Sequence, residues 1–288
     1  MKNQITEKQV IPLVKTAVNT LLRNKILLFP YSMIVFVQLF ILEILYFIPR
    51  FPLNKFFSPI ITTFWSEKYL HYPLNLLLLP QLFQKAQPPV YILISSFFVA
   101  ASIYVISEIN NKEDINILDA FKRVLTQYIH IVIATLISFL LIIFFFEGYG
   151  LIVKRAMIIR STQGVFYWIK VLVIGGTPYV SLLISIFVTT IFAYVYPAIV
   201  LDKKKIFSAI GINFKMLSKS FWNTFFLVLI PTLFFVPILL LRNSFPIDLS
   251  IPEIRLWLLI LSIFIMIMID AVVYTAVTIF YLTKKEVV

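Results

Sequence analysis

The sequence predicts an all-α integral membrane protein with about six transmembrane helices. Three observations lead to this fold class: 61% of the 288 residues are hydrophobic, only 13% are charged, and the mean hydropathy is +0.97. Soluble domains are about 45–50% apolar and about 25% charged, so one soluble core could not bury this excess. The same figures exclude a disordered chain, and the absence of cysteine excludes a disulfide scaffold.

Six apolar segments are long enough to cross a bilayer, which takes about 20 helical residues. They are residues 26–48, 90–107, 129–146, 179–200, 222–241 and 256–282. Helix-breaking residues set the ends of the first three. Pro49 follows the first segment, Pro88 and Pro89 precede the second, and Glu147-Gly148 ends the third.

The later segments carry breaks of their own. Gly175-Gly176-Thr177-Pro178 separates the fourth span from residues 165–174, which we predict to be an interfacial helix. Pro231 and Pro237 lie inside the fifth span, where they predict a bend. The six spans leave no room for a large soluble domain, so residues 1–288 are predicted to be a single membrane domain.

Three amphipathic helices are predicted on the cytoplasmic side, before spans one, three and five. The first opens with Thr6-x-x-Gln9, a possible capping box, and the others start near Asn116 and after Lys205. Apolar residues at steps of three and four give each helix one apolar stripe. The stripes are Val10, Leu13, Val14, Ala17, Val18, Leu21 and Leu22; Ile117, Phe121, Val124, Leu125 and Tyr128; and Ile206, Ile210, Phe214, Leu217 and Phe221.

This order predicts a threefold internal repeat of amphipathic helix, span and span, over residues 6–109, 112–200 and 203–282. Ala17, Ala120 and Ala209 stand at comparable points of the three units. An alternative reading needs no repeat, because any six-span protein with cytoplasmic juxtamembrane helices shows the same order.

The distribution of Lys and Arg predicts that both termini are cytoplasmic. With the N-terminus inside, 15 of the 25 basic residues fall on the cytoplasmic side. The four tryptophans fall at span ends or in interfacial loops, where indole rings are favoured. They are Trp65, Trp168, Trp222 and Trp257.

Basic residues next to the spans predict contacts with anionic lipids. The candidates are Lys15, Arg23, Lys25, Lys203, Lys204 and Lys205. They lie within a turn or two of the spans, so we expect no nucleic-acid partner despite the net charge of +12.

Asp270 is the candidate intramembrane polar site. It lies near the middle of the sixth span, where an ionisable side chain is costly and is usually functional. Ser262, Met266, Tyr274 and Thr278 recur with it every four residues, so they form one mostly polar stripe. Two readings stay open: a proton, cation or substrate site facing the bundle interior, or a structural interhelical hydrogen bond.

No arrangement of residues in the sequence is typical of catalysis, metal binding or cofactor binding. The two histidines, His71 and His130, have no carboxylate at ligand spacing, and no phosphate-binding or hydrolase motif is present. We therefore expect a protein that is not an enzyme and has no cofactor. The long outer loop 50–89 is apolar in parts, and we expect it either to cover the bundle or to dock a partner protein. The interfacial helices are the alternative docking surface for such a partner.

The stretch from Tyr196 to Trp222 resembles a motif of a known family. It resembles the polytopic membrane domain that is fused to some bacterial and archaeal glycerophosphodiester phosphodiesterases. The matching residues are Pro197, Val200, Asp202, Ala209, Leu217, Lys219 and Trp222. Asn213 stands where the family has a small hydroxyl residue, and Ser220 where it often has glycine. The resemblance implies a six-span, non-catalytic domain of a prokaryotic cytoplasmic membrane, without the phosphodiesterase barrel.

These patterns give two hypotheses for function. The first is a non-catalytic scaffold, accessory subunit or lipid-interacting protein. The second is a transporter or channel for ions, small solutes or lipid, with a polar site around Asp270. A water-filled cavity at Asp270 favours the second, and a dry, hydrogen-bonded aspartate favours the first.

Overall fold

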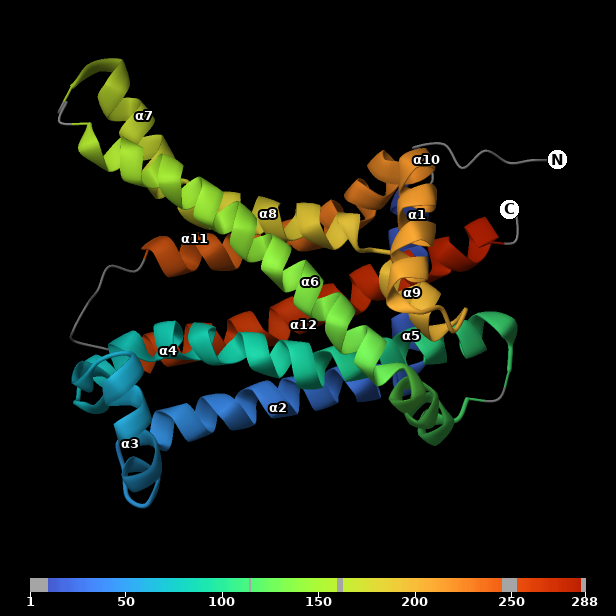
Figure 1. Cartoon of the computed structure of the whole chain (residues 1–288), viewed down its shortest axis with the longest axis horizontal. Helices are drawn as coiled ribbons and strands as arrows, with labels where there is room; N and C mark the ends of the chain where they lie inside the picture. Colours follow the sequence, from blue (N-terminus) through green and yellow to red (C-terminus); the bar gives the residue numbers. More distant parts are fainter. Residues whose placement is uncertain (1–9, 114, 160–162, 245–252, 286–288) are drawn as a thin grey trace.

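The computed structural model describes residues 10–113, 115–159, 163–244 and 253–285, and every regular element in these ranges is helical (Figure 1). The predicted capping box Thr6-x-x-Gln9 lies outside the described residues. The α-helices are α1 (Val10–Arg23), α2 (Leu28–Phe47), α3 (Leu53–Phe64), α4 (Leu74–Val90), α5 (Ser96–Asn111), α6 (Ile117–Ile158), α7 (Gly164–Gly175), α8 (Thr177–Ile191), α9 (Val195–Val200), α10 (Ile206–Leu233), α11 (Val236–Ser244) and α12 (Glu253–Lys285). Two short 3₁₀-helices, η2 (Lys25–Leu27) and η3 (Glu67–Leu70), and one π-helix, η4 (Tyr91–Ser95), complete the set.

Five of these helical segments are long and apolar enough to cross a membrane, or six if the bent pair α10–α11 counts as one span. This confirms the all-α membrane fold class. The first predicted span corresponds to η2 and α2, and the sixth to α12.

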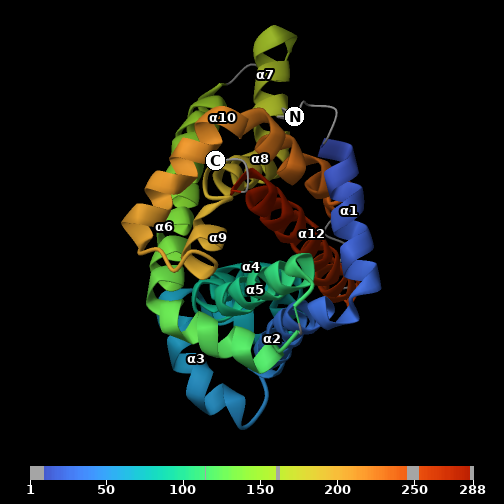
Figure 2. The same ribbon diagram turned by 90° about the vertical axis from the view of Figure 1, so that its right-hand side faces the viewer.

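Helix α12 forms the centre of the bundle. It contacts α1, α2, α4, α5, α10 and α11, and Figure 2 shows it surrounded by α1, α2, α5 and α10. Its C-terminal half is its most buried part, with Ala271, Ala276 and Phe280 fully enclosed. Tyr274, Thr275 and Thr278, on this half of α12, are buried against other helices.

The second span begins much earlier than predicted. Pro88 and Pro89 were expected to precede it, but α4, η4 and α5 form one helical segment from Leu74 to Asn111, and both prolines lie inside it. Proline has no amide hydrogen, so each one removes a hydrogen bond to the carbonyl four residues earlier. The π-helix η4 follows the two prolines, and such a local widening of the helix is a recognised response to missing backbone hydrogen bonds.

The third span is longer than predicted. Helix α6 continues without a break from Ile117 to Ile158, so Glu147-Gly148 does not end it. Glycine inside a helix costs only about 1 kcal/mol, which a long apolar helix tolerates. The helix start predicted near Asn116, for the segment before this span, is confirmed at the beginning of α6, because Asn116 is the N-cap and its side chain accepts a hydrogen bond from the amide of Leu118 at 3.0 Å.

The fourth and fifth spans are both interrupted. Helices α8 and α9 are separated by a turn over residues 192–194. Helices α10 and α11 meet at an angle of 44°, next to the two prolines that predicted a bend. Helix α10 also has a kink at Ser220 (φ −142°, ψ 23°), two residues before the expected start of the fifth span.

The segments predicted as amphipathic helices all lie at one end of the bundle. Figure 2 shows α1, the start of α6 and the start of α10 around this end. Ala17, Ala120 and Ala209 are each fully buried, so all three helices place an alanine against the core. Leu22, in contrast, was placed on the apolar stripe of the first helix but is 69% exposed. The threefold repeat itself remains a prediction.

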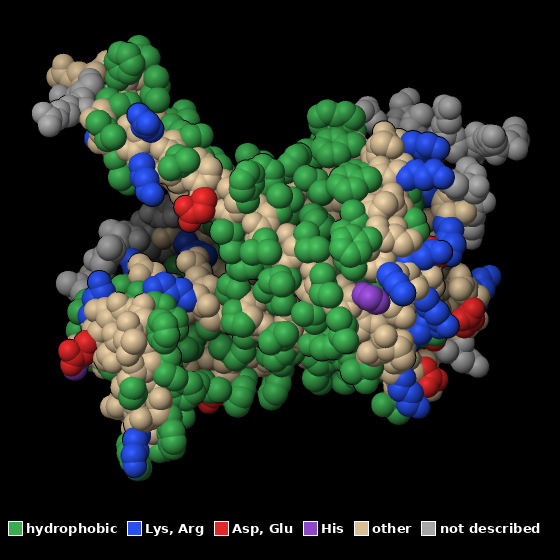
Figure 3. All heavy atoms as spheres, in the orientation of Figure 1, with side chains coloured by type: hydrophobic (Ala, Val, Ile, Leu, Met, Phe, Trp, Pro, Cys, Tyr) green, Lys and Arg blue, Asp and Glu red, His purple; other side chains and the backbone are tan. Residues whose placement is uncertain are grey.

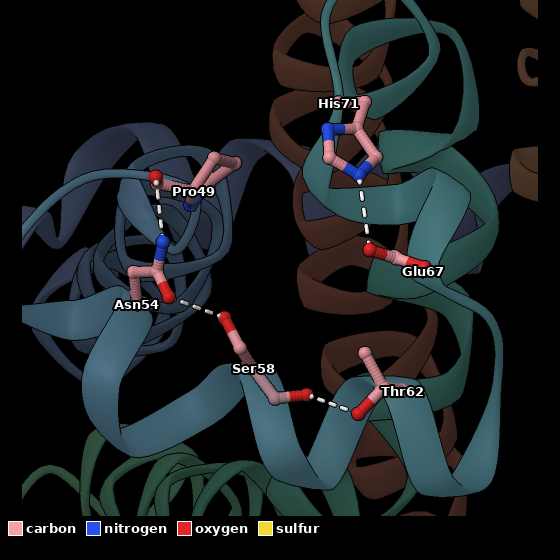
Figure 4. A network of polar contacts seen from close by, with 6 residues as sticks. All are labelled: Pro49, Asn54, Ser58, Thr62, Glu67 and His71. Carbon is pink, nitrogen blue, oxygen red and sulfur yellow. Dashed lines mark hydrogen bonds and ion pairs between the residues drawn. The ribbon is translucent and has the colours of Figure 1, made fainter.

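Residues 50–89 do not form a single outer loop. They contain α3, η3 and most of α4. The loop prediction was wrong for the part from Leu74 onward, since α4 belongs to the second span. Figure 4 shows polar side chains along α3: Ser58 donates to Asn54 at 2.7 Å, and Thr62 donates to the carbonyl of Ser58 at 2.9 Å. The side chain of Asn54 also donates to the carbonyl of Pro49 at 3.4 Å.

A small hydrophobic cluster, separate from the main core, packs α3 and η3 against the end of α2 and against α4. Its buried members are Ile48, Ile61, Tyr69 and Leu82. Beside it, the Nε2 atom of His71 and the Oε1 atom of Glu67, four residues apart, lie 3.5 Å from each other, and both side chains are mostly exposed (Figure 4). The expectation that neither histidine has a carboxylate at such a spacing was therefore wrong for His71. Helix α7, at residues 164–175, confirms a helix where the interfacial helix 165–174 was predicted, and it has no buried residue.

The surface has the pattern expected for a protein in a bilayer. Hydrophobic side chains cover the middle of the face shown in Figure 3, and Lys and Arg gather at its right-hand end. That end contains α1, the start of α10 and the C-terminus of α12 (Figure 1). Large apolar side chains such as Phe36, Phe144 and Met268 are more than half exposed, as lipid contact requires.

Candidate functional site

Asp270 lies within α12, near its middle, and its side chain is half-buried. No hydrogen bond or ion pair joins its carboxylate to another residue of the described ranges. A charged side chain at the bilayer centre costs about 2.5–3.5 kcal/mol on insertion scales. Asp270 therefore needs compensation from a proton, a cation or polar neighbours.

Tyrosine side chains from α12 itself and from other helical segments form a cluster near this position. We call Tyr31, Tyr91, Tyr196 and Tyr274 the tyrosine cluster; they come from α2, η4, α9 and α12. The charge of an ionised Asp270 acts on the hydroxyls of Tyr31, Tyr91 and Tyr274. The middle of the bundle therefore combines one carboxylate with several phenol groups.

Short hydrogen bonds connect the tyrosine cluster to the rest of the bundle. The hydroxyls of Tyr91 and Tyr274 are 3.1 Å apart, and those of Tyr196 and Thr135 are 2.7 Å apart. Ser102 donates to the hydroxyl of Tyr31 at 2.8 Å. Through these bonds, groups on α2, α5, α6, α9 and α12 form a polar interior at the level of Asp270.

Two of the irregular helical segments contribute residues to the tyrosine cluster. The π-helix η4 supplies Tyr91, and α9, which follows the turn at residues 192–194, supplies Tyr196. The rings of Tyr196 and Tyr274 lie 6.1 Å apart. Interrupted helices are common at functional sites of membrane proteins because they can change conformation locally.

The other predicted site residues lie on α12 and are buried. Tyr274 belongs to the tyrosine cluster. Ser262 donates to the carbonyl of Leu258, and Thr278 to the carbonyl of Tyr274, both on their own helix. The structure therefore brings Tyr274 together with Asp270, whereas Ser262 and Thr278 bond locally.

Two clefts lie at opposite ends of the same pair of helical segments, the second span and α12. The first has a volume of about 210 Å³, and its lining includes Gln81, Gln84, Arg242 and Arg255. The side chain of Arg255 donates to the carbonyl of Leu77 at 3.3 Å. In Figure 3 the molecule is hollowed at this left-hand end, and charged side chains line the hollow.

The second cleft has a volume of about 500 Å³ and lies at the basic end of the molecule. Its lining residues are Tyr104, Ser107, Glu108, Asn111, Glu113, Arg123, Leu201, Leu282 and Lys285. We call it the Glu108 cleft. Asp270 lines neither cleft, and along α12 it lies between the residues of that helix that line the two clefts.

A second polar network fixes α9 against its neighbours. Asp202, which follows α9, accepts from the hydroxyl of Tyr281 at 2.6 Å and lies 2.5 Å from the ammonium group of Lys285. The side chain of Asn213 accepts from the amide of Tyr194 at 3.0 Å and donates to the carbonyl of Ile191 at 2.6 Å. The two bonds of Asn213 satisfy backbone groups that the break between α8 and α9 leaves without helical partners.

The candidate lipid contacts are all exposed. They are Lys15 and Arg23 on α1, Lys25 on η2, and Lys203, Lys204 and Lys205 before α10. Helices α1 and α10 contact each other, so these residues gather at one end of the bundle.

Among the described residues, no group of three or more His, Cys, Asp or Glu side chains could hold a metal ion. Comparisons with protein-family models, with curated proteins and with solved structures gave no match.

Proposed function

We propose that this protein is a membrane carrier for a small polar solute or lipid headgroup, with Asp270 as its intramembrane binding group. The observation that carries this proposal is the position of Asp270. It is a carboxylate without a bonded partner in the described ranges, within the tyrosine cluster and between two clefts. Carriers typically place their binding site near the bilayer midplane, beside interrupted helices.

The chemistry of this site favours a positively charged ligand. A carboxylate accepts hydrogen bonds only, and the neighbouring tyrosine rings attract cations to their faces. A proton or an ammonium group at Asp270 would remove the cost of its buried charge. We therefore propose that the carrier binds a proton, an ammonium-bearing solute or both at this point.

Movement across the membrane would require the tyrosine cluster to open toward each cleft in turn. The irregular segment η4, the turn between α8 and α9, and the bend between α10 and α11 are candidate hinges. Since they lie on the second, fourth and fifth spans, opening would rearrange these spans around α12.

A scaffold or accessory subunit is the second candidate, and one observation favours it. The hydroxyls of Tyr91 and Tyr274 are bonded to each other, those of Tyr31 and Tyr196 are bonded to the side chains of Ser102 and Thr135, and Asp270 lines neither cleft. A packed polar interior of this kind also suits a protein whose only role is structural.

Several further features belong to both proposals. We propose that the basic end faces the cytoplasm of a prokaryote. We also propose that α1 and the starts of α6 and α10 lie along the membrane surface, where their Lys and Arg side chains bind anionic lipids. The resemblance to the membrane domain fused to glycerophosphodiester phosphodiesterases supports this location and a non-catalytic role. A partner protein docking on α3 remains a further proposal.

Transport in liposomes tests the carrier proposal. We expect the reconstituted protein to carry protons or labelled glycine, the smallest zwitterionic probe, at least tenfold faster than empty liposomes do. Asp270→Asn should reduce this flux to background, because a neutral amide cannot balance a cation. The uptake of probe and the signal of a trapped pH dye would be measured side by side.

Glu147→Gln is the matched control for this experiment. Glu147 is also an acid on a membrane-spanning helix, but its side chain is exposed, so we expect an unchanged flux. If wild type and Asp270→Asn gave the same flux as empty liposomes, the scaffold proposal would be favoured instead.

A further inference from the structure

The Glu108 cleft contains two charged side chains of opposite sign, each with one buried atom that has no hydrogen-bond partner. Glu108 lies near the end of α5 and is only 7% exposed. Its Oε2 atom is buried and has no hydrogen-bond partner. A buried carboxylate oxygen without a partner is costly, and this one lines an open cleft.

Arg123, on α6, is the second such group. Its Nε atom is also buried without a hydrogen-bond partner. The guanidinium lies over the ring of Tyr104, 5.4 Å from the ring centroid, and Tyr104 is one helical turn before Glu108. The aromatic ring thus holds the arginine in place, and its Nε–H is a donor that a ligand would satisfy.

The other charged groups of the cleft are already engaged. Lys285 forms an ion pair with Asp202 at 2.5 Å. Glu113 accepts a hydrogen bond from the side chain of Asn111 at 3.4 Å. Glu108 and Arg123 are therefore the charged groups of this cleft that a ligand would satisfy.

We propose that the Glu108 cleft binds a zwitterion, with a primary ammonium group at Glu108 and a phosphate or carboxylate at Arg123. A simple cation would leave Arg123 unsatisfied, and a simple anion would leave Glu108 unsatisfied. The volume of about 500 Å³ falls within the usual range for small-molecule sites. Ethanolamine phosphate has this chemistry, either as a free solute or as the headgroup of phosphatidylethanolamine. The inference concerns binding alone and does not depend on transport.

Equilibrium binding to the purified full-length protein in detergent tests the proposal. The probes are ethanolamine phosphate, dihexanoyl phosphatidylethanolamine, dihexanoyl phosphatidylcholine and dihexanoyl phosphatidylglycerol. We expect the ethanolamine compounds to bind at least tenfold more tightly than the choline lipid, whose ammonium has no N–H donor. The glycerol lipid has no ammonium group and should be weaker by a similar factor.

Three variants locate the site. Glu108→Gln and Arg123→Gln should each weaken binding at least tenfold. Glu108→Gln should also raise the melting temperature of the ligand-free protein, because it removes a buried charge that has one unpartnered oxygen. A binding loss together with a stability gain separates a ligand site from a folding defect. Lys122→Gln is the control, since Lys122 is exposed and lies 3.8 Å from Asp119 outside the cleft.

The pattern of binding also identifies the source of the ligand. Equal affinity for ethanolamine phosphate and its lipid would support a free solute, and binding of the lipid alone would support a membrane headgroup. Equal affinity for phosphatidylethanolamine and phosphatidylglycerol would overturn the proposal. So would binding that survives both Glu108→Gln and Arg123→Gln in folded protein, or the absence of binding by both ethanolamine probes.

Discussion

Replacing Tyr194 by alanine should lower the free energy of unfolding by about 3–5 kcal/mol, the usual cost of truncating a buried aromatic residue. Tyr194 is fully buried in the turn before α9. Its ring lies 6.2 Å from that of Phe280 and 6.1 Å from that of Tyr281, and its hydroxyl is hydrogen-bonded to Thr224. Helices in membranes associate mainly through such packing, so the cavity would loosen α9 from α10 and α12.

Tyr194→Phe separates packing from hydrogen bonding at this position, and Phe166→Ala is the surface control. Tyr194→Phe keeps the ring and removes the bond to Thr224, so it should cost about 1 kcal/mol. Phe166→Ala, on the exposed surface of α7, should change stability by less than about 0.5 kcal/mol. Equilibrium unfolding in mixed micelles would measure all three. Equal losses for Tyr194→Ala and Tyr194→Phe would contradict the packing argument.

Replacing Asn213 by leucine should cost about 3 kcal/mol. Asn213 is 1% exposed and bonds both the amide of Tyr194 and the carbonyl of Ile191. The break between α8 and α9 leaves these backbone groups without helical partners, and each buried group without a partner costs about 1–3 kcal/mol. Leucine keeps the branching of asparagine but is larger, so the expected loss combines the two missing hydrogen bonds with some overpacking.

The control for this substitution is Asn19→Leu. Asn19 is an exposed asparagine on α1, and its replacement should change stability by less than about 0.5 kcal/mol. Circular dichroism during unfolding in mixed micelles would follow both proteins. A loss below about 1 kcal/mol for Asn213→Leu would show that the turn does not depend on this side chain.

Composition predicted the spans, and helix-breaking residues predicted where the spans end. The composition of the segments was the more reliable of these two signals. Runs of apolar residues located the first, fourth and sixth spans well, because length and hydropathy decide whether a helix can cross a bilayer. Pro88, Pro89 and Gly148 gave wrong span boundaries, because the helices continue through them. In an apolar setting the backbone must keep its own hydrogen bonds, so the helix continues through residues that would end it in water.

Only part of the candidate site could be predicted in the same way. Asp270 stands out because an acid inside an apolar run is rare. The tyrosine cluster does not stand out, because tyrosine is common in such runs and its contacts join distant residues. Tyr91 and Tyr274 are 183 positions apart, and Thr135 and Tyr196 are 61 apart. Asn213 was noted only as a departure from the family pattern, and its role at the break needed the structure.

The most direct test of the carrier proposal is whether the surroundings of Asp270 open to both sides of the membrane. The chain has no cysteine, so a single Met266→Cys substitution, one turn before Asp270 on a half-buried face, gives a specific label site. A small membrane-impermeant thiol reagent would be applied to spheroplasts and to everted vesicles, with exposed Lys203→Cys as the control that reacts from one side. The carrier proposal predicts labelling of Met266→Cys in both preparations, at a rate slowed by ligand. A cysteine at position 266 that reacts in neither preparation, while Lys203→Cys reacts normally, would contradict it.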